Sequence, residues 1–305
     1  MSDMQKAEFN VSVTDRQKEE TEKLIEALRN NPAIRYLFKA NNIPEEYLRK
    51  SPWKLRDWLV AYKPCQGCRG LENCGQKKRG YYSSLVYDGL LHTEFKACKY
   101  MRSELQQTAH MKNYLVSDLG SSLHRVVFKS IDPEQETPAY RSVLLAAMNH
   151  TDSERGLFIY GTMGVGKTYL AACAANERAR KGDKTAFIHY PTFTMRMAAQ
   201  VNEGEYRTEL KRLMYADFLV IDDIGAENCT EWNRDQLLLP LLNYRYENKK
   251  TTWFTSNQDE ITLKIHFTFS SKGKEEALKA ERIIERIRAL AEFVPLSGKD
   301  RRKPL

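Results

Sequence analysis

One short segment constrains the fold of this chain more than any other, a glycine-rich run in the second half of the sequence. It consists of Gly161, Thr162, Met163, Gly164, Val165, Gly166, Lys167 and Thr168. The run matches the P-loop pattern, in which a glycine and four further residues precede Gly-Lys-Ser or Gly-Lys-Thr. Glycines allow several backbone amides to converge on one phosphate, and a helix that starts there adds the positive end of its dipole. The pattern therefore predicts a loop that binds the phosphates of ATP.

The residues around this loop predict an α/β fold, with a buried parallel sheet flanked by helices. Continuous apolar runs, which are typical of strands buried on both faces, alternate with segments of helical character. We expect strands over residues 157–160, 186–190, 218–221, 251–255 and 293–296. Pro295 favours an edge position for the last of them.

Acidic and amide side chains follow two of these strands. Asp222 and Asp223 come at the end of the third strand, and Asn257 follows the fourth. We expect Lys167 to reach the outer phosphates, and Thr168 and Asp222 to hold magnesium. Asp223 would orient or deprotonate the attacking water. Asn257 would hold that water or the γ-phosphate, although a plain polar turn has the same composition.

Two basic segments leave alternatives open. Residues 281–288 include three arginines that could supply the positive charge for phosphoryl transfer, but a solvated helix face would show the same spacing. Residues 190–196 combine Tyr190 and Phe193 with Arg196, as a channel for single-stranded DNA would. A solvated amphipathic helix explains that stretch equally well.

Four cysteines cluster before residue 100. Cys65 and Cys68 have the two-residue spacing of a zinc knuckle, Cys74 follows closely, and Cys98 lies further on. Four thiolates complete a tetrahedral Zn²⁺ site with no open position, so the metal would be structural and would help to fold a small domain. His92 is the alternative fourth ligand in place of Cys98. Four unrelated reduced thiols are the simpler interpretation.

Composition limits the partners of the chain rather than its fold. The sequence carries 48 Lys and Arg against 40 Asp and Glu, a formal net charge of +8, which suits an anionic partner such as nucleic acid or serves solubility alone. No apolar run is long enough to span a bilayer, and the first residues lack the apolar core of a secretory signal. We therefore expect a cytoplasmic protein with no membrane partner.

A turn-rich stretch from Ser130 to Thr137 marks the expected boundary between domains. We divide the chain into residues 1–105, a small mainly helical zinc-binding domain, residues 106–136, a linker, and residues 137–305, the nucleotide-binding domain.

With these motifs placed, nearly the whole chain resembles the bacterial DnaI-type replicative helicase loaders. Its nucleotide-binding half is also similar to DnaC-type loaders and to the helper ATPases of some transposons. The resemblance is carried by Gly161–Thr168, Val220–Glu227, Thr255–Asn257 and Gly298–Arg302, together with the cysteine-bearing first domain. It implies an AAA+ fold for residues 137–305.

The resemblance also implies roles that spacing does not show. Asp222 and Asp223 would take the Walker-B positions, where most AAA+ proteins have glutamate second, so we expect weak ATP hydrolysis that a partner stimulates. Asn257 would be the sensor-1 residue. Arg286 would be the arginine finger that reaches the ATP of a neighbouring subunit. Arg302 would be the sensor-2 arginine, with the adjacent Arg301 as the alternative.

The function implied by the resemblance is that of an ATP-dependent loader. The first domain would dock on the hexameric replicative DNA helicase, and the AAA+ domain would bind ATP and single-stranded DNA and assemble with its neighbours. Such a loader helps to place the helicase on DNA during replication initiation or restart, with other primosome or initiator proteins as further candidate partners. Two alternatives are a small-molecule P-loop kinase and a zinc-bearing adaptor on DNA with a vestigial ATP site.

Overall fold

The structure is a computed structural model, and it describes residues 14–200, 206–269 and 276–301. The chain divides into two compact units with the boundary between Gln106 and Gln107, and we describe each unit by itself. Within the described ranges, no helix is long and apolar enough to cross a bilayer.

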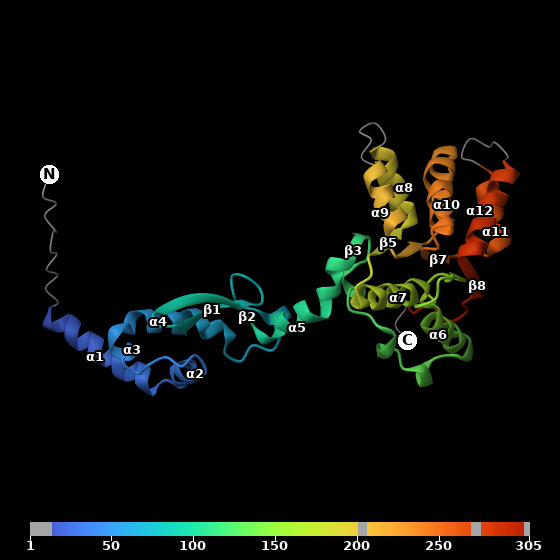
Figure 1. Cartoon of the computed structure of the whole chain (residues 1–305). Coiled ribbons are helices and arrows are strands. Elements are labelled where there is room, and N and C mark those ends of the chain that lie inside the picture. The colour runs from blue at the N-terminus through green and yellow to red at the C-terminus, as the bar shows by residue number, and fades with distance from the viewer. Residues whose placement is uncertain (1–13, 201–205, 270–275, 302–305) are drawn as a thin grey trace, which may run out of the picture. The chain divides into compact units, whose positions relative to one another are not determined.

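The first unit is a helical cluster packed on a β-hairpin (Figure 1). Its elements are α1 (Asp15–Asn30), α2 (Pro32–Ala40), α3 (Tyr47–Lys50), α4 (Pro52–Tyr62), β1 (Tyr81–Tyr87), β2 (Leu91–Ala97) and α5 (Lys99–Thr108), which runs across the boundary. Thr14 begins α1 with a capping box to Gln17, and Asn31 caps α2, whose first residue is a proline. Apolar residues of α1, α2 and α4 form the core with Leu85 and Leu91 of the hairpin.

The hairpin corrects the expectation of a mainly helical first domain. β1 and β2 pair antiparallel over their whole length, from Tyr81 opposite Ala97 to Tyr87 opposite Leu91. The turn between them contains Gly89 at a φ of +108°, a conformation that glycine adopts without strain. Aromatic and β-branched residues on both sides of an Asp-Gly pair are a recognisable hairpin signal in the sequence, which the prediction missed.

The second unit is built on a six-stranded, fully parallel sheet with the order β3-β5-β6-β7-β4-β8. The strands are β3 (Tyr114–Ser117), β4 (Gly156–Tyr160), β5 (Thr185–His189), β6 (Phe218–Asp222), β7 (Thr251–Ser256) and β8 (Ala291–Pro295). All five expected strands are confirmed, and β8 lies at an edge as its proline predicted. β3 was not expected, because it lies in the segment that we interpreted as a linker.

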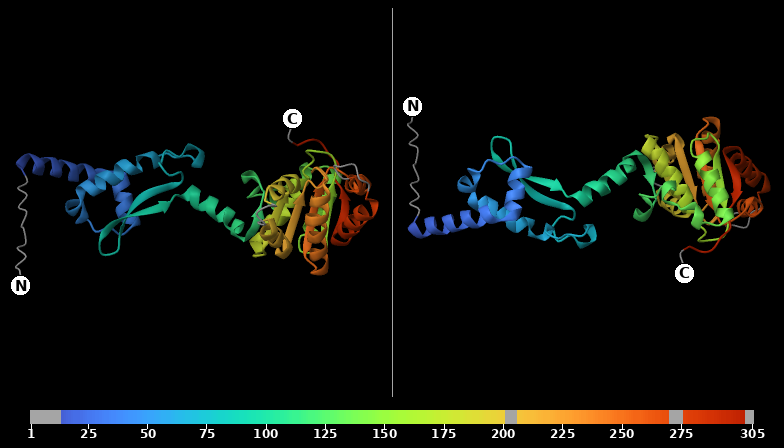
Figure 2. Two further views of the ribbon diagram at one scale, coloured as in Figure 1. Left: turned by 90° about the horizontal axis from the view of Figure 1, so that it is seen from above. Right: turned by 90° about the horizontal axis from the view of Figure 1, so that it is seen from below.

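Helices cover both faces of this sheet (Figure 1). They are α6 (Pro138–His150), α7 (Lys167–Lys181), α8 (Tyr190–Ala199), α9 (Tyr206–Tyr215), a π-helical turn at Asn233–Leu238, α10 (Leu239–Glu247), α11 (Glu260–Thr268) and α12 (Ala277–Leu290). α6 and α7 lie on one face and α8 to α12 on the other, and the views from above and below in Figure 2 look onto these two layers in turn. Along β6, Leu219 and Ile221 face the second layer and Phe218 and Val220 face the first, so the strand is buried on both sides.

Candidate nucleotide-binding site

The glycine-rich loop joins β4 to α7 and has the backbone that only glycine tolerates. Gly161, Gly164 and Gly166 have φ values of +150°, +82° and +106°. A Cβ on Gly161 would lie 2.0 Å from the carbonyl oxygen of Leu296, so no larger residue fits there. Gly166 directly precedes the first turn of α7, where helix amides are free to bind an anion.

Lys167 lies inside the loop, and its ammonium group is held by three oxygen atoms. Nζ donates to the carbonyl oxygens of Gly161 and Thr162 and to Oδ1 of Asn257, each at 2.8 Å. The side chain is buried, so these acceptors replace water around the charge. The loop and the end of β7 therefore meet at this lysine.

Asp222 lies at the end of β6, beside the first turn of α7. Its Oδ1 accepts hydrogen bonds from the hydroxyls of Thr168, at 2.8 Å, and Thr255, at 2.6 Å. Burial raises the pKa of the Asp222 carboxyl above its ordinary value, and the two hydrogen bonds offset part of that effect. A hydroxyl and a carboxylate side by side are the oxygen ligands that Mg²⁺ uses in P-loop proteins.

Asp223 follows at a φ of +59°, which is uncommon for a residue with a side chain. Its amide donates to Oγ1 of Thr255 at 2.9 Å, and its Oδ1 accepts from Nδ2 of Asn257 at 2.8 Å. Nε2 of His189, at the end of β5, lies 3.8 Å from Oδ2. The carboxylate is thus held from two sides, and Asn257 bridges it to Lys167.

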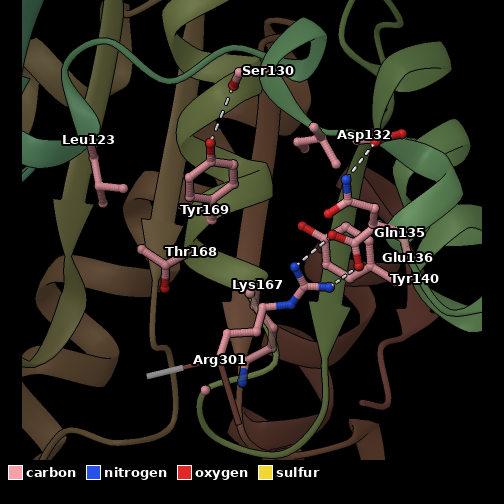
Figure 3. Close-up of a pocket in the computed structure, with 13 residues that line it drawn as sticks. Leu123, Ser130, Asp132, Gln135, Glu136, Tyr140, Lys167, Thr168, Tyr169 and Arg301 are labelled. Carbon is pink, nitrogen blue, oxygen red and sulfur yellow. Dashed lines mark hydrogen bonds and ion pairs between the residues drawn. The ribbon is translucent and has the colours of Figure 1, made fainter. Parts of the chain in front are cut away.

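A cavity of about 770 Å³ opens beside the loop, within the range of small-molecule sites. Figure 3 shows its lining, in which the guanidinium of Arg301 lies beside the carboxylate of Glu136 and the ring of Tyr140. Arg301 forms an ion pair with Glu136, and its guanidinium carbon lies 3.8 Å from the centre of the Tyr140 ring. Its amide donates to the carbonyl of Gly164, which ties the C-terminal segment to the loop.

Most of this lining was missed by the sequence analysis. Besides loop residues, the cavity is lined by Leu123, Ser130, Ile131, Asp132, Gln135, Glu136, Tyr140, Tyr169 and Arg301. Several of them come from the stretch that we interpreted as a linker. No motif marks that stretch, and its Asp-Pro-Glu-Gln composition is ordinary for a turn, so only the fold brings it to the loop.

Arg286, the residue proposed as an arginine finger, is not among the described residues that line this cavity. Arg286 lies on α12, where Nε donates to Oδ1 of Asn243 at 2.7 Å and the guanidinium carbon lies 4.8 Å from the centre of the Tyr246 ring. Arg302 lies outside the described residues, and Arg301 is the C-terminal arginine that lines the cavity.

The four cysteines line one cavity in the first unit, of about 500 Å³, and His92 does not. Backbone amides donate to two of the sulfurs, from Gly80 to Cys74 and from Met101 to Cys98. Within the described residues, however, no group of three or more His, Cys, Asp or Glu side chains is arranged to hold a metal ion. The predicted zinc site is therefore not shown.

The aromatic residues proposed to stack on DNA are not available for it. Tyr190 is 1% exposed and Phe193 is fully buried, because both lie on the inner face of α8. Arg196 forms ion pairs with Asp118 and Glu209. The expectation that residues 190–196 provide a stacking surface is wrong, since the apolar side chains of this helix pack into the core.

Comparison with known proteins identifies the family to which this geometry belongs. Residues 78–304 match the model of the family described as IstB-like ATP binding protein. The replicative helicase loader DnaI of Bacillus subtilis (strain 168) is 31% identical over 293 residues, which cover 93% of each chain. The chain is an IstB-like ATP-binding protein of the DnaI type. The glycine-rich loop Gly161–Thr168 lies within the residues that match this ATP-binding family.

Solved structures agree with this placement. A crystal structure of DnaI superposes with a TM-score of 0.54 at 27% identity, covering 61% of this chain and 98% of that one. A crystal structure of the DnaC helicase loader superposes with a TM-score of 0.50 at 22% identity, covering 58% and 100%, and shows likeness of fold alone. The DnaI-type chain thus shares the α/β fold of the AAA+ loaders, with a parallel sheet flanked by helices.

Proposed function

We propose that this chain is an ATP-dependent loader of the hexameric replicative DNA helicase, which helps to place the helicase on single-stranded DNA during replication initiation or restart. The observation that carries the proposal is an ATP site on a chain that matches a replicative helicase loader over 93% of both lengths. In this proposal the first unit docks on the helicase, in the cytoplasm, and the second unit responds to ATP. Other primosome or initiator proteins are further candidate partners.

The residues at the loop fit ATP with Mg²⁺. Lys167 and the glycine-rich backbone would bind the outer phosphates, and the cavity beside them, bounded by Tyr140 and Arg301, has room for the nucleoside. Thr168 and Asp222 would hold Mg²⁺, directly or through water. When bound, the ion neutralises charge on the phosphates.

Hydrolysis would be the task of the neighbouring residues. Asp223 is positioned to accept a proton from water, and Asn257 fixes its carboxylate by a hydrogen bond. Arg286 would complete the site of the next subunit on self-assembly, and Arg302 remains the proposed sensor-2 residue. Because the final positive charge comes from a neighbour, hydrolysis by the isolated chain should be slow and should rise on assembly.

A loading assay tests the proposal. Replacing Lys167 by alanine should abolish ATP-dependent transfer of the replicative helicase to single-stranded DNA, because the ammonium is the main cation at the phosphates. Lys181→Ala is the matched control, since that lysine ends the same helix and forms only an exposed ion pair with Asp152. Loading that is equal in wild type and Lys167→Ala would refute the role of ATP. A chain that neither binds nor loads the helicase would refute the function itself.

A structural zinc ion is a further part of the proposal. The four cysteines share one cavity. Hydrogen bonds from the backbone amides of Gly80 and Gln76 lower the pKa of the Cys74 thiol, which favours the thiolate that binds metal. We expect elemental analysis of the purified full chain to give one zinc per molecule. Cys68→Ser should lose it and unfold the first unit, whereas Cys229→Ser, in the second unit, should retain it. Wild-type protein without zinc would contradict this part.

A further inference from the structure

We propose that the β-hairpin of the first unit is a second binding site for single-stranded nucleic acid, built from a stacked aromatic pair and the cations around it. This inference goes beyond the proposed function, which gives the first unit the task of docking on the helicase. The site consists of Lys78, Tyr81 and Phe95, and we call it the aromatic platform. It lies wholly within the first unit.

The platform follows from the register of the hairpin. Tyr81 pairs with Ala97 and Ser83 pairs with Phe95, so Tyr81 and Phe95 are diagonal neighbours on the same face. Their ring centroids are 5.5 Å apart and their planes differ by 7°, a parallel stack. Further along the same face, Leu85 and Leu91 are buried in the core, whereas Phe95 is 56% exposed. The apolar face of the hairpin therefore extends beyond the helices that cover it.

A cation completes the platform. Nζ of Lys78 lies 4.5 Å from the centroid of the Tyr81 ring and 5.6 Å from that of Phe95. Flat rings beside a fixed positive charge are the arrangement with which proteins bind unpaired bases and the phosphates between them. Duplex DNA hides its base faces within the stack, so the platform suits a single strand.

The charge around the platform favours an anionic ligand. Residues 76–102 carry six Lys and Arg but only two Asp and Glu. The acidic side chain of Glu94 is already paired with Lys96, and Lys77 and Lys99 have no carboxylate partner in the described part of the chain. A protein partner would be expected to bring acidic groups to the same place, so the test below separates the two.

A cleft next to the platform is also lined by aromatic and basic side chains. The cavity that the four cysteines line, of about 500 Å³, has Tyr81 as one wall. It is also lined by four more tyrosines and two cations, Tyr36, Tyr62, Tyr82, Tyr100, Lys99 and Arg102. Aromatic side chains beside cations are the groups with which proteins bind a flexible single strand.

The test measures binding of the full chain, without nucleotide, to fluorescein-labelled oligo(dT) of about 20 nucleotides, longer than the roughly 4–16 that one compact domain covers. Phe95→Ala should raise the Kd at least about fivefold, the lower end of the cost of losing one stacked base. Phe95→Tyr should retain the affinity. Leu90→Ala is the matched control, because Leu90 is exposed on the same hairpin but outside the stack.

The salt dependence of oligo(dT) binding tests the role of Lys78 separately, with a substitution that leaves the apolar core unchanged. Lys78→Ala should reduce the slope of log K against log salt by about 0.7, the value for one phosphate contact on a single strand. Lys23→Ala, an exposed lysine on α1 of the same unit, should leave the slope unchanged. Crosslinking with 5-iododeoxyuridine should map to residues 78–95 in the wild type and not in Phe95→Ala, which distinguishes this site from DNA bound at the ATPase unit.

Two results would overturn the inference. The first is an affinity and a salt slope that neither variant changes, together with crosslinks confined to residues 107–305. The second is normal oligo(dT) binding by variants that lose the replicative helicase in a pull-down, which would make the platform a protein contact. Loss of helicase loading by Lys167→Ala, in contrast, has no bearing on the platform, so this test and that of the proposed function fail independently.

Discussion

Asn257 joins the two halves of the candidate catalytic site, and its replacement by alanine should separate ATP binding from ATP hydrolysis. Its side-chain amide accepts from Lys167 and donates to Asp223, each at 2.8 Å. A hydrogen bond to a charged group contributes about 1.5–3 kcal/mol. Asn257 is exposed, so water takes over much of this contribution on truncation. We therefore expect the free energy of unfolding to fall by only about 1 kcal/mol.

The effect on the reaction should be much larger. Loss of one preorganised hydrogen-bond donor from a catalytic site lowers turnover by about 10²–10³-fold. The groups that bind phosphate, Lys167 and the loop amides, stay in place in Asn257→Ala. We expect the single-turnover rate of hydrolysis, measured with helicase and single-stranded DNA present, to fall about 100-fold. The equilibrium Kd for a fluorescent ATP analogue should change by less than about threefold.

Asn248→Ala is the matched control for this experiment. Asn248 is an exposed amide in the same unit, and it donates only to the carbonyl of Tyr244 at the end of α10. It should keep both the rate and the affinity of the wild type. If Asn257→Ala hydrolyses ATP at the wild-type rate, or loses affinity in the same proportion as rate, the assignment of Asn257 to the hydrolytic step is wrong.

Three further predictions test other parts of the second unit. Arg245 is fully buried and donates to Thr252 Oγ1 and to the carbonyls of Leu213, Ala216 and Thr251. Arg245→Met should therefore lower the free energy of unfolding by about 3–5 kcal/mol and the Tm, measured by calorimetry, by about 6–20 °C. Arg212→Met, on the exposed face of α9, should change neither. Arg286→Ala should preserve ATP affinity but remove the rise in hydrolysis on assembly, and a collapse of affinity would exclude the finger role. Because burial raises the pKa of Asp222, the folded state binds a proton more readily than the unfolded chain. As pH falls toward the ordinary pKa of an aspartate, wild type should gain stability relative to Asp222→Asn, while its Mg²⁺-dependent ATP affinity declines. Parallel profiles of unfolding free energy against pH for the two proteins would contradict this.

The parts of the site that the sequence predicted are those fixed by local chemistry. Gly161–Thr168 requires left-handed glycines and a helix start, and Asp222 must follow a buried strand, so both are visible in the order of residues. The carboxyl ends of neighbouring parallel strands meet at one edge of a sheet, which is why Asn257, at the end of its strand, could be listed as a candidate for the site from the sequence.

The parts that the sequence did not predict depend on long-range packing. Glu136 and Arg301, which are 165 positions apart in the sequence, form an ion pair, and Glu136 lies in no motif. Tyr140 and Arg301 come together only because α6 and the C-terminal segment both pack against the loop. The expected stacking role of Phe193 failed for the same reason, since the pattern of apolar residues on α8 does not say which face the core covers.

The hydrogen bonds that Lys167 donates indicate how binding of a nucleotide would alter contacts elsewhere in the second unit. When Lys167 turns its ammonium to a phosphate, Asn257 loses the donor to its Oδ1, and the amide is then held only through Asp223. The Asp223 carboxylate in turn lies 3.8 Å from His189, which directly precedes α8. Lysine, amide, carboxylate and imidazole thus form one contiguous path from the phosphate loop to the base of α8. Such a path transmits a change only if its members have two arrangements, and a bound phosphate would offer Lys167 a second acceptor. If these residues do have two arrangements, ATP binding would change the contacts at the start of α8.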